Sequence, residues 1–552
     1  MAKLSGGEAL IKSMVREGVE VVFGLPGVQM YGIVAALRDE PSIKFVVTRN
    51  ETATSYMADG YARTTGKPGV VLVVPGPGVY NAGGGLSTAF SRSSPVVFIA
   101  GQIPRSTIGK NLGGLHEVND QKEITNPVTK WQTQVLRPQD VPENIHEAFR
   151  QAQSDRPSPV HFELPPETMV EREEVELLEP AKIVRKVPDN SVIEQAAKEI
   201  AAARKPVIYA GGGIARSDAE AELVAFAEAH NIAVITSAGG KGTISERHPL
   251  ALGASLGPGG QLKNYIEDAD MIIGIGTRFS MRTQAGGEAR LVHVDADPEM
   301  IGHVHANSLG VVGDVKATLP VLSAAIVEAG GGKWHSPADE VATIRTNLAD
   351  TEDEQNRPQE DYLQALQRGA PDDAVMIFGM TQLGYYSRPR WITENPKTYI
   401  DSGYSGNLGF AFPTALGAKV GNPDKAVICV SGDGGFMYNS SEISTAVKYG
   451  INLVTVIYND GHYGNVARDL DDDFGGAYET DFVNPDFVKL AEAYGAVGMR
   501  AKDPLDVENL IPQALAMNKP VFIDVPVSRV PRPKQWSARA AWTTPQDGLI
   551  ED

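Results

Sequence analysis

The sequence is nearly free of cysteine, because its 552 residues contain only one, Cys429. A single cysteine excludes a disulfide within the chain and a metal site built from several cysteines. Cys429 lies in the apolar run Ala426–Val430, which predicts a buried strand in which the thiol serves packing.

Positive charge and long apolar runs are also scarce. Lys and Arg number 50 against 69 Asp and Glu, which gives a net charge of -19. This charge repels polyanions, so neither nucleic acid nor an anionic membrane surface is expected as a partner. No run reaches the roughly 18 apolar residues of a membrane span, and the N-terminus lacks the pattern of a signal peptide. We therefore expect a cytoplasmic protein.

The chain is long enough for several hydrophobic cores, since 42% of its residues are hydrophobic. Short runs rich in Val and Ile, such as Val21–Phe23, Val70–Val74 and Val96–Ile99, alternate with helical patterns and end in loops with Gly or Pro. This pattern predicts parallel strands that are buried on both faces. Because it recurs three times, we expect an α/β fold with three doubly wound parallel-sheet domains.

Two polar stretches separate the expected domains. The first includes Val170–Glu176 and reads as a charged linker, after which Ser191 opens a helix with the spacing of a capping box. The second runs from Gly330 to Pro358. The predicted domains are residues 1–170, 188–335 and 358–552.

A similar segment closes each of the two outer domains. The first closes with Pro159–Pro165 and the last with Pro520–Pro526, and each segment follows a helical pattern and a short polar loop. The two domains are either copies of one sheet topology or similar only in these seven residues.

The segment from Cys429 to Gly464 carries the clearest chemical signal. It reads as a strand, a glycine-rich turn with Asp433, a helix, and a second strand that ends near Asn459. Ligands bind at the carboxyl ends of parallel strands, so the side chains of Asp433 and Asn459 can converge there. Their oxygens suit Mg²⁺ or Ca²⁺, and the turn offers N–H groups to a phosphate. The alternative is that both segments are only turns.

These residues carry a resemblance to a known family. Gly432-Asp433-Gly434, with Asn459 further along, resembles the thiamine diphosphate motif, and Gly406–Gly421 resembles acetohydroxyacid (acetolactate) synthase catalytic subunits. Other segments resemble that family in the same order over almost the whole chain: Met57–Arg63, Gly76–Val79 with Asn81, Gly211–Gly213, Lys241 with Gly242, and Val292–Pro298.

The resemblance implies an enzyme that uses thiamine diphosphate and Mg²⁺. The first domain would bind the aminopyrimidine and the last the diphosphate, with the cofactor between subunits of a homodimer or homotetramer. Mg²⁺ would be held by Asp433, Asn459 and the carbonyl of Gly461. The positions implied in cofactor binding are Pro26, Gly27, Gly76, Asn81, Gly406, Leu408, Gly432, Asp433, Gly434, Gly435, Asn459, Gly461, His462 and Tyr463.

Glu51 matches the catalytic glutamate of that family, which shares a proton with a nitrogen of the pyrimidine ring. The structural alternative is a capping box, because Thr48 and Glu51 also have that spacing at the start of a helix.

Several residues depart from the family pattern around the substrate. Asn50 replaces a histidine, and Leu115-His116-Glu117 replaces Phe-Gln-Glu, which makes His116 a candidate catalytic proton shuttle as an alternative to a passive surface residue. The candidate substrate contacts are Val28, Gln29, Asn50, His116 and Asn465.

The expected reaction is decarboxylation of a 2-oxo acid such as pyruvate, with transfer of the acyl unit to a second carbonyl. One alternative is thiamine-dependent cleavage of a carbon–carbon bond in a 1,2-dione, a 2-hydroxyacyl-CoA or oxalyl-CoA; the basic tail with Arg529, Lys534, Trp536 and Arg539 could meet a CoA phosphate. Another alternative, a non-catalytic nucleotide-binding regulator, is disfavoured by the presence of Glu51, Asp433 and Asn459.

The central domain has glycine-rich strand ends, where relatives bind FAD, ADP or nothing. Arg278-Phe279-Ser280-Met281 replaces the Arg-Phe-Asp-Asp of the synthases, which weakens the case for FAD. Glycines with a purely structural role are the alternative.

Overall fold

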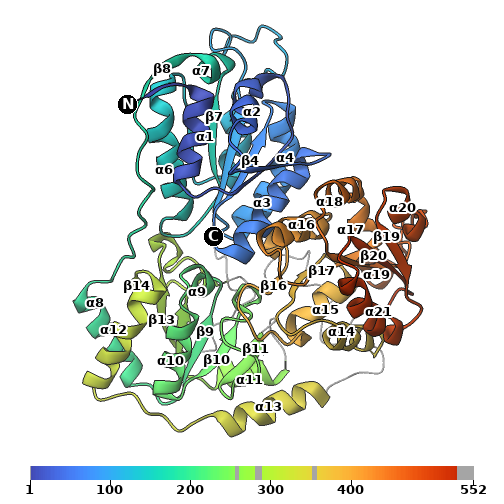
Figure 1. Cartoon of the computed structure of the whole chain (residues 1–552). Helices are drawn as coiled ribbons and strands as arrows, with labels where there is room; N and C mark the ends of the chain where they lie inside the picture. The colour runs from blue at the N-terminus through green and yellow to red at the C-terminus, as the bar shows by residue number, and fades with distance from the viewer. Residues whose placement is uncertain (1, 255–259, 280–288, 351–356, 531–552) are drawn as a thin grey trace.

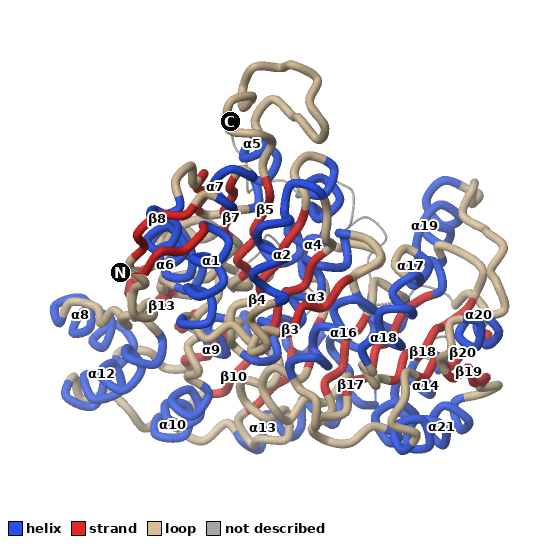
Figure 2. The backbone as a smooth tube through the Cα atoms, turned by 45° about the horizontal axis from the view of Figure 1, so that its top comes forward, coloured by secondary structure: helices blue, strands red, loops and turns tan. Residues whose placement is uncertain are grey.

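The computed structural model describes residues 2–254, 260–279, 289–350 and 357–530, and it contains three six-stranded parallel sheets with flanking helices (Figure 1). Figure 2 shows the strands of each sheet enclosed by helices. The expected α/β fold with three doubly wound sheets is therefore confirmed.

The N-terminal sheet is built from the predicted Val- and Ile-rich runs. Its strands lie in the order β3 (Lys44–Val47), β2 (Val21–Gly24), β4 (Gly69–Val73), β5 (Val96–Gly101), β7 (Val160–Leu164) and β6 (Trp131–Gln134). The helices of this part are α1 (Gly6–Arg16), α2 (Tyr31–Arg38), α3 (Glu51–Thr65), α4 (Pro77–Ser91), α5 (Gln121–Thr125), α6 (Val141–Gln153) and α7 (Pro166–Val170).

The charged stretch that was expected to be a linker contains a strand. Strand β8 (Arg172–Val175) pairs antiparallel with β1 (Ala2–Ser5), with Lys3 opposite Glu174 and Ser5 opposite Arg172. The prediction of a plain linker is wrong because an exposed two-stranded ladder is held by backbone hydrogen bonds and charge pairs, which leave no hydrophobic alternation in the sequence.

The central sheet has the strand order β11 (Ala251–Ala254), β10 (Ala233–Thr236), β9 (Pro206–Ala210), β12 (Met271–Ile275), β13 (Arg290–Asp295) and β14 (Leu309–Val312). In chain order this is 3-2-1-4-5-6, the arrangement of dinucleotide-binding folds. Its helices are α8 (Asn190–Ala201), α9 (Gly213–Arg216), α10 (Glu220–His230), α11 (Gly260–Glu267) and α12 (Val315–Glu328).

One expectation at the edge of the central domain is wrong, and one polar stretch contains a helix. Helix α8 begins at Asn190 after Asp189, so Ser191 lies inside the helix and caps nothing. The polar stretch from Gly330 to Pro358 contains helix α13 (Ala338–Asp350), whose apolar residues Val341 and Ile344 are buried. These two buried apolar residues in a mostly polar helix of 13 residues were too few to be recognised as a pattern.

The C-terminal sheet has the order β16 (Tyr399–Ile400), β15 (Val375–Phe378), β17 (Val427–Gly432), β18 (Val454–Asn459), β20 (Val521–Pro526) and β19 (Val497–Arg500). Its helices are α14 (Arg357–Gly369), α15 (Gln382–Arg390), α16 (Ala411–Gly421), α17 (Asp433–Met437), α18 (Ile443–Tyr449), α19 (Gly464–Phe474), α20 (Phe487–Ala493) and α21 (Pro504–Ala516).

The outer two sheets share one topology. Numbered within each sheet, both follow the order 2-1-3-4-6-5, and the echoing segments Pro159–Pro165 and Pro520–Pro526 form the equivalent strands β7 and β20. The interpretation that the two outer domains are copies of one sheet topology is therefore confirmed.

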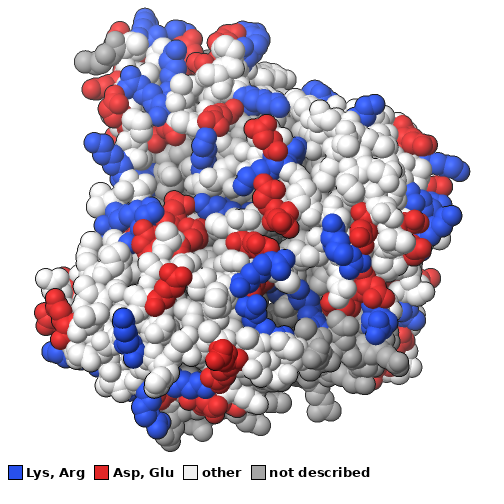
Figure 3. Space-filling model, turned by 60° about the horizontal axis from the view of Figure 1, so that its bottom comes forward, with Lys and Arg blue, Asp and Glu red and all other residues white. Residues whose placement is uncertain are grey.

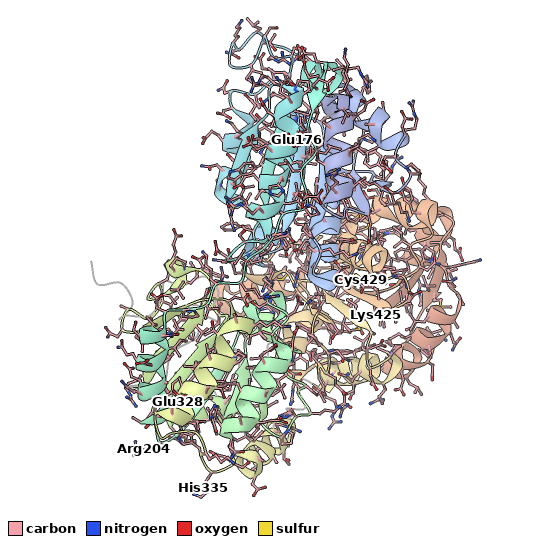
Figure 4. The ribbon with its side chains drawn as sticks, turned by 60° about the vertical axis from the view of Figure 1, so that its left-hand side comes forward. Glu176, Arg204, Glu328, His335, Lys425 and Cys429 are labelled. Carbon is pink, nitrogen blue, oxygen red and sulfur yellow. The ribbon has the colours of Figure 1, made fainter. Side chains whose placement is uncertain are left out.

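The N- and C-terminal domains pack through helices α3 and α16, which lie side by side in Figures 1 and 2. One continuous hydrophobic cluster joins the two sheets and includes Phe23, Met57, Phe412 and Cys429. Figure 4 places Cys429 inside the C-terminal domain, where it is fully buried on β17 as predicted, and burial raises the pKa of its thiol.

Acidic and basic side chains are interspersed on the face shown in Figure 3, so the net charge does not gather into one block there. Within the described residues, no helix has both the length and the apolar character needed to cross a membrane.

The close contact of α3 and α16 gives a test of the packing. An added Cβ at Gly417 would overlap the Met57 carbonyl. We expect Gly417→Ala to lower the free energy of unfolding by about 1–3 kcal/mol, because the two helices must separate. Urea unfolding measures this, with Gly476→Ala as a control because its added Cβ meets no atom within 4 Å. Equal midpoints for both variants would contradict the prediction.

Candidate active site

Asp433 and Asn459 meet because of the register between two neighbouring strands. Gly432 on β17 pairs with Tyr458 on β18, so the next residues, Asp433 just after β17 and Asn459 at the end of β18, lie side by side. Asp433 is 2% exposed and is the first residue of α17.

Several donors hold the Asp433 carboxylate. The Gly434 N–H donates to Oδ1 at 2.8 Å, and the Gly461 N–H donates to Oδ2 at 2.8 Å. The side chain of Asn484 donates from Nδ2 to Asp433 Oδ2 at 2.7 Å and to Asn459 Oδ1 at 2.9 Å. The carboxylate and the amide oxygen are therefore linked by one shared donor.

These residues fit a magnesium ion that also binds a diphosphate. The donor set is one carboxylate, one amide oxygen and the nearby Gly461 carbonyl, all of which are hard oxygen ligands. Burial raises the pKa of Asp433, and burial together with the Asp433 charge raises the pKa of Asp460 to about 6, so the site favours added positive charge. No cluster of three His, Cys, Asp or Glu side chains suited to a metal occurs in the described part of the chain. A cation here would depend on ligand oxygens as well.

The glycines of this edge make room for such a ligand. An added Cβ at Gly434 would lie 2.8 Å from the Tyr463 ring, and Gly461 has a φ of 69°, which favours glycine. Gly435 and Gly406 are half-buried with no close neighbour to an added Cβ. Leu408 is half-buried, and His462 Nδ1 lies 2.7 Å from the Asp460 carbonyl.

Glu51 lies at the carboxyl edge of the N-terminal sheet, where it is the first residue of α3 and is 8% exposed. Asn81 Nδ2 donates to Glu51 Oε2 at 3.0 Å. The alternative reading as a capping box is wrong, because Asn50 caps α3 by accepting from the Thr52 N–H. The Thr48 hydroxyl donates to the Asn50 carbonyl.

The side chains of His116 and Gln29 form a hydrogen-bonded pair in the same domain as Glu51. Gln29 Nε2 donates to the Leu115 carbonyl at 3.0 Å, which turns Gln29 Oε1 toward His116 Nδ1 at 2.8 Å. Because an amide oxygen only accepts, Nδ1 carries a hydrogen, and in the neutral ring the lone pair is on Nε2. His116 has a φ of 66°, and its carbonyl lies where a Cβ at Gly76 would be.

The other predicted positions differ in their exposure. Pro26 and Val28 are exposed, Gly27 packs on Val74, and Asn50 is exposed. Asn465 Oδ1 is buried without a hydrogen-bond partner among the described residues. Among the described residues of one chain, no hydrogen bond joins Glu51 and Asn81 to Asp433, Asn459 and Asn484.

Sequence reasoning missed two residues that organise these edges. Asn484 links Asp433 to Asn459, and Gln121 accepts from the Gly76 N–H at 2.9 Å while donating to Gly101 and Glu163. The turn signal of Asn484-Pro485-Asp486 before α20 indicates only a helix start. Nothing in the sequence indicates the target of either side chain.

The glycines of the central domain serve its own fold. The N–H groups of Gly211 and Gly213 donate to the carbonyls of Ile275 and Gly276, and a Cβ at Gly211 or Gly213 would overlap Gly276. This favours the structural reading of these glycines. Ser280, Met281 and the tail residues Lys534, Trp536 and Arg539 lie outside the described residues.

The three parallel sheets define a multidomain α/β protein, and the outer two place polar groups at their carboxyl edges, where ligands bind in this class of fold. Three family models give the narrower assignment: the N-terminal TPP binding domain of thiamine pyrophosphate enzymes matches residues 4–124, the central domain 193–322, and the C-terminal TPP binding domain 379–525. The chain belongs to the thiamine pyrophosphate enzymes.

Similar proteins extend over nearly the whole length. The chain is 34% identical to a probable acetolactate synthase large subunit of Methanocaldococcus jannaschii, over 95% of this chain and 92% of that one. It is 32% identical to the acetolactate synthase isozyme 3 large subunit of Escherichia coli, over 96% and 95%. It is also 32% identical to a probable 2-ketoarginine decarboxylase of Pseudomonas aeruginosa, over 92% and 90%.

A buried carboxyl at the carboxyl edge of the central sheet gives a prediction about pH. Burial raises the pKa of Asp295, which is 8% exposed, to about 6. Between about pH 4 and this value the folded state holds a proton that the unfolded state has lost, so stability falls as pH rises. We expect Asp295→Asn to raise the free energy of unfolding by up to about 2–3 kcal/mol at pH 8 and little at pH 4.

Urea unfolding at the two pH values measures the difference between Asp295→Asn and the unchanged protein. Asp268→Asn is the control, because the Asp268 side chain is 72% exposed. An equal gain for Asp295→Asn at both pH values would contradict the prediction.

Proposed function

We propose that the protein is a thiamine diphosphate- and Mg²⁺-dependent enzyme that decarboxylates a 2-oxo acid, with pyruvate as the first candidate, and transfers the acyl unit to a second carbonyl. The observation that carries the proposal is the pairing of Asp433 with Asn459 at one sheet edge and Glu51 with Asn81 at another. The similar acetolactate synthases and 2-ketoarginine decarboxylase support this class of reaction.

Asp433, Asn459 and the Gly461 carbonyl would hold the cation and, through it, the diphosphate. The Gly435 N–H lies on the same turn and favours an anion, whereas the Gly434 N–H donates to Asp433. The chemistry supplied by thiamine diphosphate, when bound, is a carbon nucleophile and an electron sink for the bond that breaks.

Glu51 is proposed as the group that takes and returns a proton. Asn81 donates to Oε2, which fixes the carboxylate and assigns the proton exchange to Oε1. Gly78 stands beside this oxygen, and a Cβ there would lie 3.7 Å from Oε1, so the glycine keeps the approach to Oε1 wide.

His116 is proposed to act in its protonated form, in which Nε2 also carries a hydrogen, and to donate that proton to the oxygen of the second carbonyl substrate as the new bond forms. Gln29 holds the ring through a hydrogen bond to Nδ1. Nε2 is therefore the nitrogen proposed to exchange a proton with the substrate. The same pair favours one second candidate, cleavage of a 1,2-dione, because a polar group near the reacting carbonyls could stabilise either direction of carbon–carbon bond chemistry. Incubation with pyruvate and with a cyclic dione, followed by product identification, separates the two.

The unit that acts is proposed to be a homodimer or a larger homo-oligomer, located in the cytoplasm, with each site shared by two copies. Its support is the exposed apolar and aromatic side chains near both groups. On the N-terminal side these are Val28, Tyr31, Tyr80, Leu112 and Leu115; on the C-terminal side they are Tyr438, Tyr463, Val466 and Phe474. The N-terminal side holds the proposed proton-transfer residue Glu51, and the C-terminal side holds the proposed cation ligands Asp433 and Asn459. Mass measurement by light scattering, with and without cofactor, tests this.

The assignment of Glu51 predicts a large loss of rate. We expect Glu51→Gln to lower pyruvate decarboxylation by about 100-fold or more, because the amide cannot take up the proton, while thiamine diphosphate still binds. Carbon dioxide release measures the rate and calorimetry the binding. Glu143→Gln, at an exposed position of α6, is the control. Full activity of Glu51→Gln would overturn the proposed role.

The assignment of His116 predicts a change in product rather than in the first step. We expect His116→Ala to keep most carbon dioxide release while the yield of the coupled product falls by about 10-fold or more, the usual scale of a lost proton-transfer group. The ratio of the two products measures this. His335→Ala is the control, since His335 is exposed at the rim of the central domain in Figure 4. An unchanged ratio would contradict the assignment.

A further inference from the structure

Asn484 lies in the connection between α19 and α20, and it contacts two of the three atoms proposed to bind the cation. Its Nδ2 is 2.7 Å from Asp433 Oδ2 and 2.9 Å from Asn459 Oδ1. The side chain is half-buried, whereas its neighbour Val483 is 99% exposed. The chain therefore turns this amide inward between two exposed neighbours, Val483 and Pro485.

The chemistry of the partners fixes which end of each amide points where. A carboxylate oxygen only accepts, so Asn484 must present its NH₂ group to Asp433. Asn459 Nδ2 donates to Asp524 Oδ1 at 3.2 Å, which turns Asn459 Oδ1 toward Asn484. An amide oxygen has two lone pairs, so Asn459 Oδ1 keeps one for a cation.

Asp524 is itself anchored. It lies on β20, is 2% exposed, and accepts at Oδ2 from Arg500 Nε at 3.1 Å and from Arg500 Nη2 at 2.9 Å. A charge-assisted, two-point contact of this kind holds a carboxylate firmly. The orientation of Asn459 thus depends on a chain of contacts that begins at the edge strand β19.

The segment that carries Asn484 also holds the third proposed ligand. The Phe482 N–H donates to the Gly461 carbonyl at 3.0 Å, and the Tyr463 N–H donates to the Thr480 carbonyl at 2.8 Å. Residues 480–484 therefore run beside residues 461–463 and touch Asp433, Asn459 and Gly461 together.

We propose that Asn484 is a positioning residue for the metal site, which orients Asp433 and Asn459 toward the cation through its two N–H groups. This inference rests on the proposed function, because it concerns the same cation. Groups that hydrogen-bond metal ligands in this way set ligand orientation, and their loss typically weakens metal binding about 10- to 100-fold.

The test measures metal binding directly. The full-length protein is stripped with a chelator and titrated with Mn²⁺ in the presence of thiamine diphosphate, and free Mn²⁺ is read by electron paramagnetic resonance. We expect Asn484→Ala to raise the Kd for Mn²⁺ by about 10-fold or more. Asn484→Ser keeps one donor and should lose less. At saturating Mn²⁺ the turnover of both variants should return toward that of the unchanged protein.

Asn452→Ala is the matched control, because it removes an exposed hydrogen bond between the side chains of Asn452 and Asn518 in the same domain. An unchanged Kd in Asn484→Ala and Asn484→Ser overturns the inference, and so does tighter binding, which would mean that Asn484 competes with the cation. Asp433→Ala separates the two proposals: if it binds Mn²⁺ as the unchanged protein does, the proposed metal site itself fails.

Discussion

The pairing of β17 with β18 is the constraint on which the proposed chemistry depends. Parallel strands place successive loops at one edge, and the register that sets Gly432 opposite Tyr458 brings Asp433 and Asn459 into the same space. A shift of one residue would turn one of the two side chains to the other face of the sheet. The buried, Val- and Ile-rich strands hold this register, so packing in the core fixes the position of polar groups at the rim.

The two outer domains show how one topology can take two roles. Both have the strand order 2-1-3-4-6-5, and both place polar residues at the carboxyl ends of parallel strands. After β17 and β18 these residues are Asp433 and Asn459, whereas after β3 the chain places Glu51. The scaffold supplies an edge with backbone groups, and in the proposed function the side chains at that edge decide whether it would hold a cation or move a proton.

Much of this arrangement could be predicted from the sequence, because it follows from local patterns. Runs such as Val70–Val74 indicate buried strands, and Asp433 and Asn459 stand just after such runs. The capping role of Asn50 was missed because Thr48 and Asn50 both suit that role in sequence, and only the backbone turn decides between them. Strand β8 was missed because its partner β1 lies at the other end of the domain. Asn484 was missed because its contacts are made by a loop that returns to Asp433 across 51 positions.

The scarcity of positive charge in the sequence extends to the surroundings of Asp433. A chain of net charge -19 holds Asp433 buried, and burial raises the pKa of that carboxyl, so the site disfavours its own charge. The donors around it, Gly434, Gly461 and Asn484, are all neutral. Neutral donors orient the carboxylate without cancelling its charge, whereas a lysine or arginine in the same place would compete with a metal ion. In the proposed function, a cation would compensate this charge, and a protein that otherwise repels anions would bind a diphosphate through that cation.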